Sequence, residues 1–476
     1  MTCESVIGLE VHAQLATNTK IFCGCSAEFG GEPNTHVCPV CLGLPGALPV
    51  LNQNVVELAM HIALAVGCEI QPRSRFLRKN YFYPDLPKGY QISQFQSNEE
   101  MPLAIGGSIE VPTADGGTKQ IQLTRIHMEE DAGKSIHEES FVAEGESLVD
   151  VNRCGVPLIE IVSEPDLSTS EEAFHYLTSL HQLLVYTGVT EGDMEKGHMR
   201  IDANVSIRPV GATELGTKVE VKNVNSFRNC QRAIETEIQR QIDLAETGGT
   251  IEQATMLYDP NRNLLRPMRT KEESDDYRYF PDPDLVPLVV DKTWVKRVHS
   301  QIPELPEAKR ARFAQTYDVT PDQIEGLTAN REIAEYFEAT VDAGAQPKPV
   351  ASWIQGDMAR AIKGLTVSPE SLAELLGLID KDTISANIGR TVFDDMIETG
   401  ASPSEIVEKK GLVQISDTSE LDGIVDQVIA DHPAEVERFK NGDKKLMGFF
   451  MGQVMKATKG QANPKMASQL VQQKLG

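Results

Sequence analysis

The chain has 476 residues, of which 40% are hydrophobic and 24% charged, and its formal net charge is -25. This length is enough for about three domains with buried cores, and the composition excludes a collagen-like or wholly disordered chain. Because so acidic a surface repels a polyanion, any contact with nucleic acid requires a local basic patch.

The N-terminal segment and the cysteines predict a cytoplasmic protein. The first ten residues hold two acids and no apolar core, unlike a secretory signal. No run of about 18 apolar residues predicts a membrane span. Eight cysteines are too few for a disulfide scaffold in a chain of this size, and four of them cluster near the N-terminus, which favours a metal in a reducing compartment.

Residues 6–15 alternate as a strand with one apolar and one polar face. Ile7, Leu9 and Val11 share the apolar face, while Glu10 and His12 project from the other. A carboxylate and an imidazole thus share one surface, which suits a ligand site. A solvated strand face is the alternative.

Four cysteines follow within one short loop containing glycine and proline, at positions 23, 25, 38 and 41. Four thiolates fill the tetrahedral coordination of structural zinc and leave no open position for catalysis. We therefore predict that Cys23, Cys25, Cys38 and Cys41 bind zinc in an insert spanning 23–41. Reduced cysteines without a metal remain the alternative.

Further acids lie on predicted strands. His127 precedes three consecutive acids, residues 129–131, and Glu160 interrupts an otherwise apolar strand, where a carboxylate needs a partner or a metal. Asp202 lies on the polar face of the strand 200–208. These acids are expected to converge on Mg²⁺, although an exposed acidic turn is the alternative for 129–131. The following Gly133-Lys134-Ser135 is no P-loop, because position 128 is methionine rather than glycine.

Helical periodicity predicts two helices in this first region. One follows a capping box of Ser168 and Glu171 and ends near Gly188, and the other spans 226–246. The strands 200–208 and 217–223 are expected to pair antiparallel. Four aromatic residues in 80–94 fit either turn packing or ligand stacking.

From about residue 291 the pattern is helical. We predict an α+β protein with a mixed-sheet domain at 1–292, an all-α domain at 293–404 and a small all-α tail domain at 405–476. The tail reverses the charge of the chain, since 438–476 contains one acid, Asp443. Its basic residues, a predicted phosphate-contacting surface, are Arg438, Lys440, Lys444, Lys445, Lys456, Lys459, Lys465 and Lys474.

Together these segments resemble the GatB family. The resemblance extends over nearly the whole chain, and its motifs lie at residues 7–12, 80–94, 127–135, 150–164, 275–281, 412–416 and 456–464. It implies a cradle-shaped catalytic domain, a helical domain and a tail related to the YqeY proteins. It also implies a heterotrimer with two partners, an amidase-family glutaminase (the A subunit) and a small C subunit.

The resemblance further implies that ATP and Mg²⁺ activate the side-chain carboxylate of Glu-tRNA(Gln) or Asp-tRNA(Asn) for amidation by ammonia. The family's catalytic site maps onto Glu10, His12, Glu130, Glu160 and Asp202, with Glu10, Glu130 and Glu160 as magnesium ligands. Phosphoryl transfer also needs cations, for which Lys134 and Arg200 are candidates.

Two other functions remain open on the sequence alone. One is a zinc-stabilised scaffold that binds tRNA without catalysis, and the other is a stand-alone Mg²⁺-dependent hydrolase. The chain itself is expected to lack glutaminase activity, because it has no serine-rich amidase signature.

Overall fold

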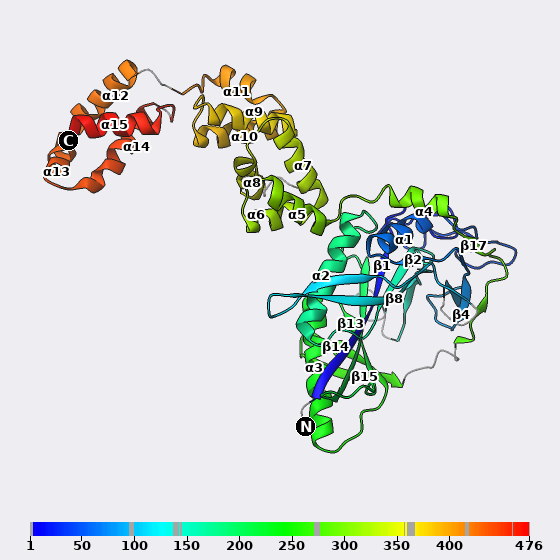
Figure 1. Ribbon diagram of the computed structural model, residues 1–476. Helices are drawn as coiled ribbons and strands as arrows, with labels where there is room; N and C mark the ends of the chain where they lie inside the picture. The colour runs from blue at the N-terminus through cyan, green and yellow to red at the C-terminus, as the bar shows by residue number, and fades with distance from the viewer. Residues whose placement is uncertain are drawn as a thin grey trace. The chain divides into compact units, whose positions relative to one another are not determined.

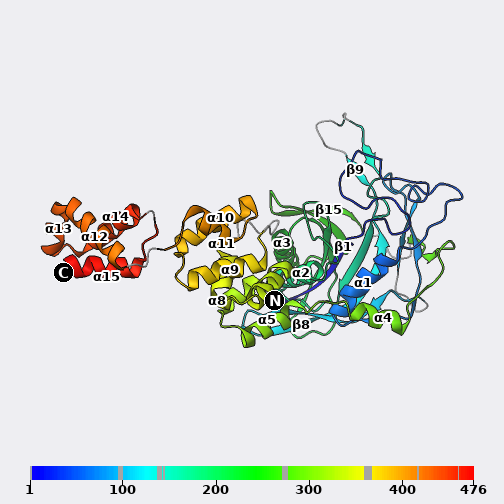
Figure 2. The same cartoon turned by 90° about the horizontal axis from the view of Figure 1, so that it is seen from above.

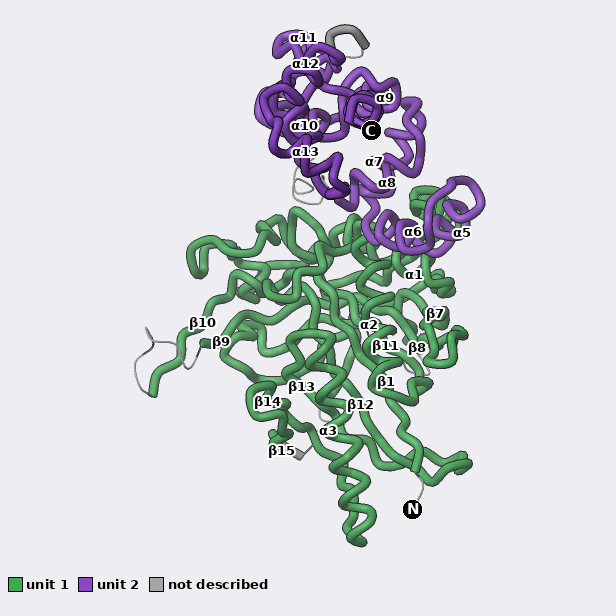
Figure 3. The backbone as a smooth tube through the Cα atoms, turned by 90° about the vertical axis from the view of Figure 1, so that its left-hand side faces the viewer, with its two compact units in different colours: residues 1–305 green, residues 306–476 purple. Residues whose placement is uncertain are grey.

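The computed structural model describes residues 3–94, 100–136, 142, 145–270, 277–356, 358, 367–414, 418–458 and 460–475. The chain divides into two compact units, residues 1–305 and 306–476 (Figure 3). The first unit combines a sheet with helices and the second is helical among its described residues. The predicted α+β class is therefore confirmed.

The first unit is built on a thirteen-stranded mixed sheet of the described residues, with the main order β15-β14-β13-β12-β1-β11-β8-β5-β4-β16. β13 and β14 pair in parallel and the other neighbours pair antiparallel. β2 pairs with β6, and both β6 and β7 pair with β8. The strands are β1 (Cys3–Gln14), β2 (Glu69–Ile70), β4 (Leu77–Asn80), β5 (Tyr90–Ser93), β6 (Ala104–Ile105), β7 (Ser108–Pro112), β8 (Thr118–Glu130), β11 (Pro157–Ser163), β12 (Met199–Pro209), β13 (Val219–Val224), β14 (Ala254–Asp259), β15 (Leu264–Thr270) and β16 (Phe280–Pro281).

Two smaller pairings complete the strands of this unit. β9 (Lys134–Ile136) pairs with β10 (Leu148–Asp150), and β3 (Arg73–Ser74) pairs with β17 (Leu288–Val289). The predicted antiparallel pair of residues 200–208 and 217–223 is confirmed as β12 and β13.

β1 lies in the middle of the sheet and has the predicted alternation. Ile7, Leu9 and Val11 are at most 1% exposed and belong to one hydrophobic core. That core also includes residues of α1 (Gln53–Ala65), α2 (Ser170–Tyr186) and α3 (Phe227–Glu246), which lie beside the sheet in Figure 1. The helices thus cover the apolar face of β1, and the face with Glu10 and His12 stays available for a site.

The two predicted helices are present, with one change at a cap. α3 begins after Ser226, whose hydroxyl accepts from the Asn229 amide, as predicted. α2 instead begins after Thr169, which accepts from the Glu172 amide, while the Glu172 carboxylate accepts from the Ser168 amide. The prediction of a Ser168–Glu171 capping box was one residue early, because threonine caps as well as serine.

The second unit contains two hydrophobic clusters, one within residues 313–407 and the other within 421–475. The predicted boundaries at 292 and 404 stay a prediction. No helix of the described residues is long and apolar enough to cross a membrane. After α4 (Lys292–His299) of the first unit come α5 (Pro306–Thr316), α6 (Pro321–Thr328), α7 (Arg331–Asp342), α8 (Pro347–Gln355), α9 (Pro369–Asp380), α10 (Ala386–Thr399), α11 (Pro403–Lys410), α12 (Thr418–Asp431), α13 (Pro433–Lys440), η2 (Lys444–Leu446), α14 (Met447–Ala457) and α15 (Pro464–Leu475).

Candidate active site

A row of polar side chains crosses the four central strands. Arg200 on β12 is the register partner of His12 on β1, His12 is that of Glu160 on β11, and Glu160 is that of His127 on β8. Neighbouring residues of such a row lie about 5 Å apart. The sheet thus brings together residues that are far apart in the sequence.

His12 is the centre of this row. Its Nε2 atom lies 3.3 Å from Glu160 Oε2 and 3.6 Å from Glu129 Oε1. Burial opposes protonation, but the hydrogen bond to Glu160 and the charges of Glu160 and Glu129 raise the pKa of His12 to about 9. Burial lowers the pKa of His127 to about 4. One imidazole therefore carries the positive charge that two buried carboxylates need.

Glu129 completes this cluster, in place of Glu130, which the sequence-based assignment favours. Residues 127 and 129 of β8 share the face of His12, and ligand atoms of His12, Glu129 and Glu160 all lie within 4.8 Å of one another. Burial raises the pKa of Glu129, because the charged carboxylate loses its contact with water. Such a site favours a cation.

Glu130 projects from the opposite face of β8. Its Oε1 atom accepts from Lys88 Nζ and, at 2.8 Å, from the Ile92 amide. It lines a cavity of about 290 Å³ together with Lys88, Cys23 and Cys41. The predicted convergence of Glu10, Glu130 and Glu160 is therefore not found in the structure, because consecutive residues of a strand face opposite sides.

Glu10 on β1 and Asp202 on β12 are register partners, and they lie two residues along the same face from His12 and Arg200. Glu10 Oε1 accepts from Asn204 Nδ2 at 2.9 Å, and Asp202 Oδ2 is 2.5 Å from Lys222 Nζ. Burial and the nearby charges of Glu160, Asp202 and Glu220 raise the pKa of Glu10. The structure thus places Glu10, His12, Glu160 and Asp202, four of the five residues predicted to be catalytic, on neighbouring register positions of one face. Their catalytic role stays a prediction.

A cavity of about 540 Å³ opens beside this cluster. Arg200 lines it and is held by Asp131, whose Oδ1 atom lies 3.0 Å from Arg200 Nη2. Lys79 also lines it, 4.8 Å from the ring centre of Tyr277. The cavity therefore presents cations as well as acids, and the polar lining comprises His12, Lys79, Tyr81, Gln91, Glu129, Asp131, Arg200, Asp202, Lys222, Asn223 and Asn225.

Asn80 holds the segment that carries Tyr277. Its Nδ2 atom donates to the carbonyls of Tyr277 at 3.2 Å and Arg278 at 2.9 Å. The aromatic motif at 80–94 and the motif at 275–281 therefore meet at the cavity, although residues 275 and 276 lie outside the described part of the chain. Sequence reasoning assigned no site role to Lys79 and Lys222, because their positions depend on this long-range packing.

Lys134 lies outside the cavity. It is exposed on β9, which Figure 2 shows projecting beyond the body of the first unit. Residues 133–135 do not line the cavity beside His12. Of the two predicted phosphate contacts, the structure brings only Arg200 to the acidic cluster.

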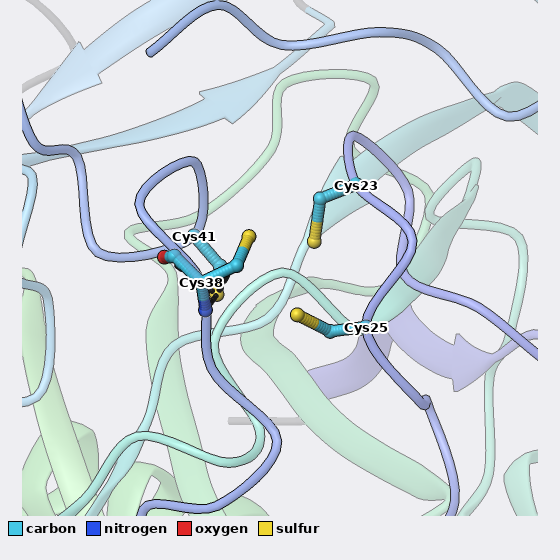
Figure 4. A group of neighbouring side chains, drawn as sticks. All are labelled: Cys23, Cys25, Cys38 and Cys41. Carbon is cyan, nitrogen blue, oxygen red and sulfur yellow. Dashed lines mark hydrogen bonds between the residues drawn. The ribbon is translucent and has the colours of Figure 1, made fainter.

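The four N-terminal cysteines point toward one another (Figure 4). Their sulfur atoms all lie within 4.8 Å of one another, and Cys38 Sγ is 3.9 Å from Cys41 Sγ. Sulfurs at about 2.3 Å from a tetrahedral zinc ion are about 3.8 Å apart. A hydrogen bond with Cys23 lowers the pKa of Cys41 to about 5, as suits a thiolate ligand. The donor set therefore fits zinc.

The predicted basic surface of the tail is partly free. Lys474 is engaged by Asp422 and Asp426, at 2.8 and 2.6 Å, and Lys459 lies outside the described residues. Arg438 pairs with Asp443 at 3.0 Å. The exposed basic side chains are Arg438, Lys440, Lys444, Lys445, Lys456 and Lys465.

Comparisons with known proteins cover both units. Residues 5–296 match the family model described as "GatB/GatE catalytic domain", and residues 335–475 match the one described as "GatB domain". A protein of Geotalea daltonii, named as the B subunit of aspartyl/glutamyl-tRNA(Asn/Gln) amidotransferase, is 55% identical over all of both chains. Proteins of the same name from Carboxydothermus hydrogenoformans, covering 99% of this chain and 98% of the relative, and from Geobacter sulfurreducens, covering all of both, are each 52% identical.

Proposed function

Because the chain belongs to the GatB family, we propose that it is the amidotransferase subunit that activates the side-chain carboxylate of Glu-tRNA(Gln) or Asp-tRNA(Asn). A carboxylate is a poor electrophile. It attacks the γ-phosphorus of ATP, ADP leaves, and an acyl phosphate forms. Ammonia then attacks the acyl carbon, and phosphate leaves as the amide forms.

The observation that carries this proposal is the His12–Glu129–Glu160 cluster beside a cavity that also presents cations. Phosphoryl transfer depends mainly on positioning and on neutralising charge. Arg200 and Lys222 are held by Asp131 and Asp202, so that their positive groups face the cavity at fixed positions. They can bind the phosphate oxygens without reorganisation in the reaction.

His12, Glu129 and Glu160 are the residues that would hold Mg²⁺, with Glu10 nearby. The His12 imidazole would release its proton on binding the ion, as a metal ligand must. Two carboxylates and one neutral imidazole would then leave positions for water and phosphate oxygens, which Mg²⁺ prefers. The ion would supply charge neutralisation at the transferring phosphate. This assignment takes Glu129 in place of Glu130, on the geometry of β8. The four cysteines would hold zinc, which supports folding of residues 23–41.

The remaining parts of the reaction fall to partners. The relatives are named as one subunit of an enzyme, and we propose a heterotrimer in which a glutaminase, the A subunit, supplies ammonia and a small C subunit completes the complex. The exposed basic residues of the tail would contact tRNA phosphates. Since aminoacyl-tRNA is a cytoplasmic substrate, we place the protein in the cytoplasm.

The test is transfer of labelled phosphate from ATP to misacylated tRNA by the reconstituted complex, with correctly acylated tRNA as the control. We expect transfer only with the misacylated form. Binding of tRNA without any phosphate transfer would favour the non-catalytic scaffold. Hydrolysis of ATP that is indifferent to tRNA would favour a stand-alone hydrolase.

A further inference from the structure

Lys20 is a lysine whose side chain is fully buried, with no exposed area. It lies between β1 and the cysteine loop, three residues before Cys23. Lysine is almost never fully buried unless it is paired, because its ammonium group loses the water that stabilises the charge. Phosphate transfer at the His12 cluster does not use Lys20, so its burial calls for another explanation.

The Lys20 ammonium makes one hydrogen bond among the described residues. Its Nζ atom donates to the His36 carbonyl at 2.7 Å. An ammonium group has three hydrogens to donate and carries a full positive charge, whereas a carbonyl oxygen is neutral. In the described part of the chain no carboxylate forms an ion pair with Lys20, so its charge needs a partner of another kind.

Two acids border the same cavity of about 290 Å³ as Lys20, and each is already paired with another cation. Glu130 accepts from Lys88 Nζ. Asp284 Oδ2 accepts from Arg78 Nη2 at 2.9 Å. Neither carboxylate is therefore left to neutralise Lys20.

The cysteine loop is the other neighbour of Lys20. A Cβ atom on Gly155 would lie 3.5 Å from Lys20 Cδ and 3.7 Å from Cys41 Cβ, so both side chains pack against the same point of the backbone. The Lys20 amide donates to the Cys25 carbonyl at 3.0 Å. His36, whose carbonyl accepts from the ammonium, belongs to the same loop. Both the main chain and the side chain of Lys20 thus hold it against the cysteines.

A zinc ion bound by four thiolates has a negative charge to offset. The four sulfurs face one another (Figure 4), and four thiolates with one Zn²⁺ together carry two negative charges. The Cys38 amide donates to Cys41 Sγ at 3.1 Å, which stabilises that sulfur but adds no net positive charge. A buried cation beside the cluster does add one, as Lys20 can.

We propose that Lys20 is the counter-cation of the zinc site, and that its buried ammonium raises the affinity of the four cysteines for zinc. An ammonium has no lone pair and cannot be a ligand, so Lys20 acts on the metal through its charge. The hydrogen bond to the His36 carbonyl fixes the position of that charge. The inference rests on the proposed zinc assignment and names a residue that supports it from outside the ligand set.

The experiment measures the zinc affinity of the full chain by competition with a chromophoric chelator at fixed pH. Lys20→Met keeps the length of the side chain and removes the charge, and the affinity should fall by about 10- to 100-fold, as for other groups that support metal ligands. Lys20→Gln keeps a donor for the His36 carbonyl without the charge, and should fall by a similar factor. Lys292→Met, at the exposed first residue of α4, removes the same charge and is the control, which should bind zinc as the wild type does.

Thermal unfolding separates this electrostatic role from a purely structural one. If Lys20 only supports the loop through its hydrogen bond, Lys20→Met lowers the melting temperature equally with and without zinc. If Lys20 is the counter-cation, the loss is larger with zinc bound, because metal-free thiols can keep their protons and carry less negative charge. The rise in melting temperature on adding zinc is then smaller in the variant than in the wild type.

The outcomes separate the proposal from the assignments on which it rests. A zinc affinity within about twofold of the wild type in Lys20→Met overturns it, as does wild-type affinity in Lys20→Gln, which would give the role to the hydrogen bond. If Lys20→Met does not fold, Lys20→Gln decides. A wild-type chain without stoichiometric zinc overturns the zinc assignment and this proposal together, and leaves phosphate transfer at the His12 cluster to its own assay.

Discussion

Replacing Glu129 and Glu130 separately by glutamine should give opposite phenotypes, although the two residues are adjacent. Glu129→Gln removes a charge from the His12–Glu160 cluster and keeps the shape that Ser93 contacts at 3.2 Å. Loss of one preorganised charge-stabilising group slows a reaction by about 10²- to 10³-fold. The melting temperature should change less than in Glu130→Gln, because Glu160 remains 3.3 Å from His12 and still balances its charge.

Glu130→Gln should act on stability instead. The Lys88 side chain is 8% exposed and would lose its ionic partner. Removing one member of a buried pair costs about 3–5 kcal/mol. At about 2 °C per kcal/mol for a unit of this size, the melting temperature of the first unit falls by about 6–10 °C.

The assay for this pair of variants is single-turnover phosphate transfer from ATP to misacylated tRNA, beside thermal unfolding of the same preparations. Phosphate transfer should persist in folded Glu130→Gln protein. Near-normal transfer by Glu129→Gln would refute the assignment of the metal cluster. Lost transfer by a fully stable Glu130→Gln protein would return the catalytic role to Glu130.

Three further predictions concern the rest of the chain. Replacing Cys38 and Cys41 by serine should abolish stoichiometric zinc, measured by elemental analysis, and lower the melting temperature, while folded protein retains phosphate transfer. A hydrogen bond from Arg297 lowers the pKa of Glu57 to about 2, from 4.5. The stability that this interaction contributes is therefore fully present above pH 4.5 and is lost as the pH falls toward 2. We expect Glu57→Gln to lower the melting temperature by about 2 °C or less at neutral pH. At pH 2 the variant and the wild type should melt at the same temperature. Neutralising the exposed tail lysines Lys440, Lys444, Lys445 and Lys456 one at a time should weaken tRNA binding, measured by titration at several salt concentrations. The slope of the affinity against salt should fall by up to about one unit per lost phosphate contact. Neutralising Lys474, which is already paired with two acids, is the control.

The sequence predicted the central strands because apolar and polar residues alternate in them. The period of two was enough to place Glu10 and His12 together on β1 and Asp202 on the polar face of β12. Within residues 126–130 of the structure, the same period separates Glu129 from Glu130. Ile126 and Met128 are both fully buried, so Glu129 and His127 share the other face.

The sequence alone does not show on which face Glu129 lies, because β8 contains an irregularity before this residue. Leu123 and Ile126 are both buried although they are three residues apart. The pairing of β8 with β11 shifts register at this point, between Val162 and Ser163. Such a bulge inverts the faces of all residues that follow it. Counting from the start of the strand would therefore give the wrong face, and only the partner strand reveals the shift.

The pairing of β1 between β11 and β12 has a consequence for synthesis of the chain. β1 leaves the ribosome well before its two neighbours, which begin only at residues 157 and 199. At about 5–20 residues per second, β1 waits roughly 7–30 s before its first neighbour is made. During that time both edges and the apolar row of Ile7, Leu9 and Val11 are unpaired, a state prone to aggregation. The strand at the centre of the candidate site is thus a segment of the nascent chain that a chaperone would protect from aggregation.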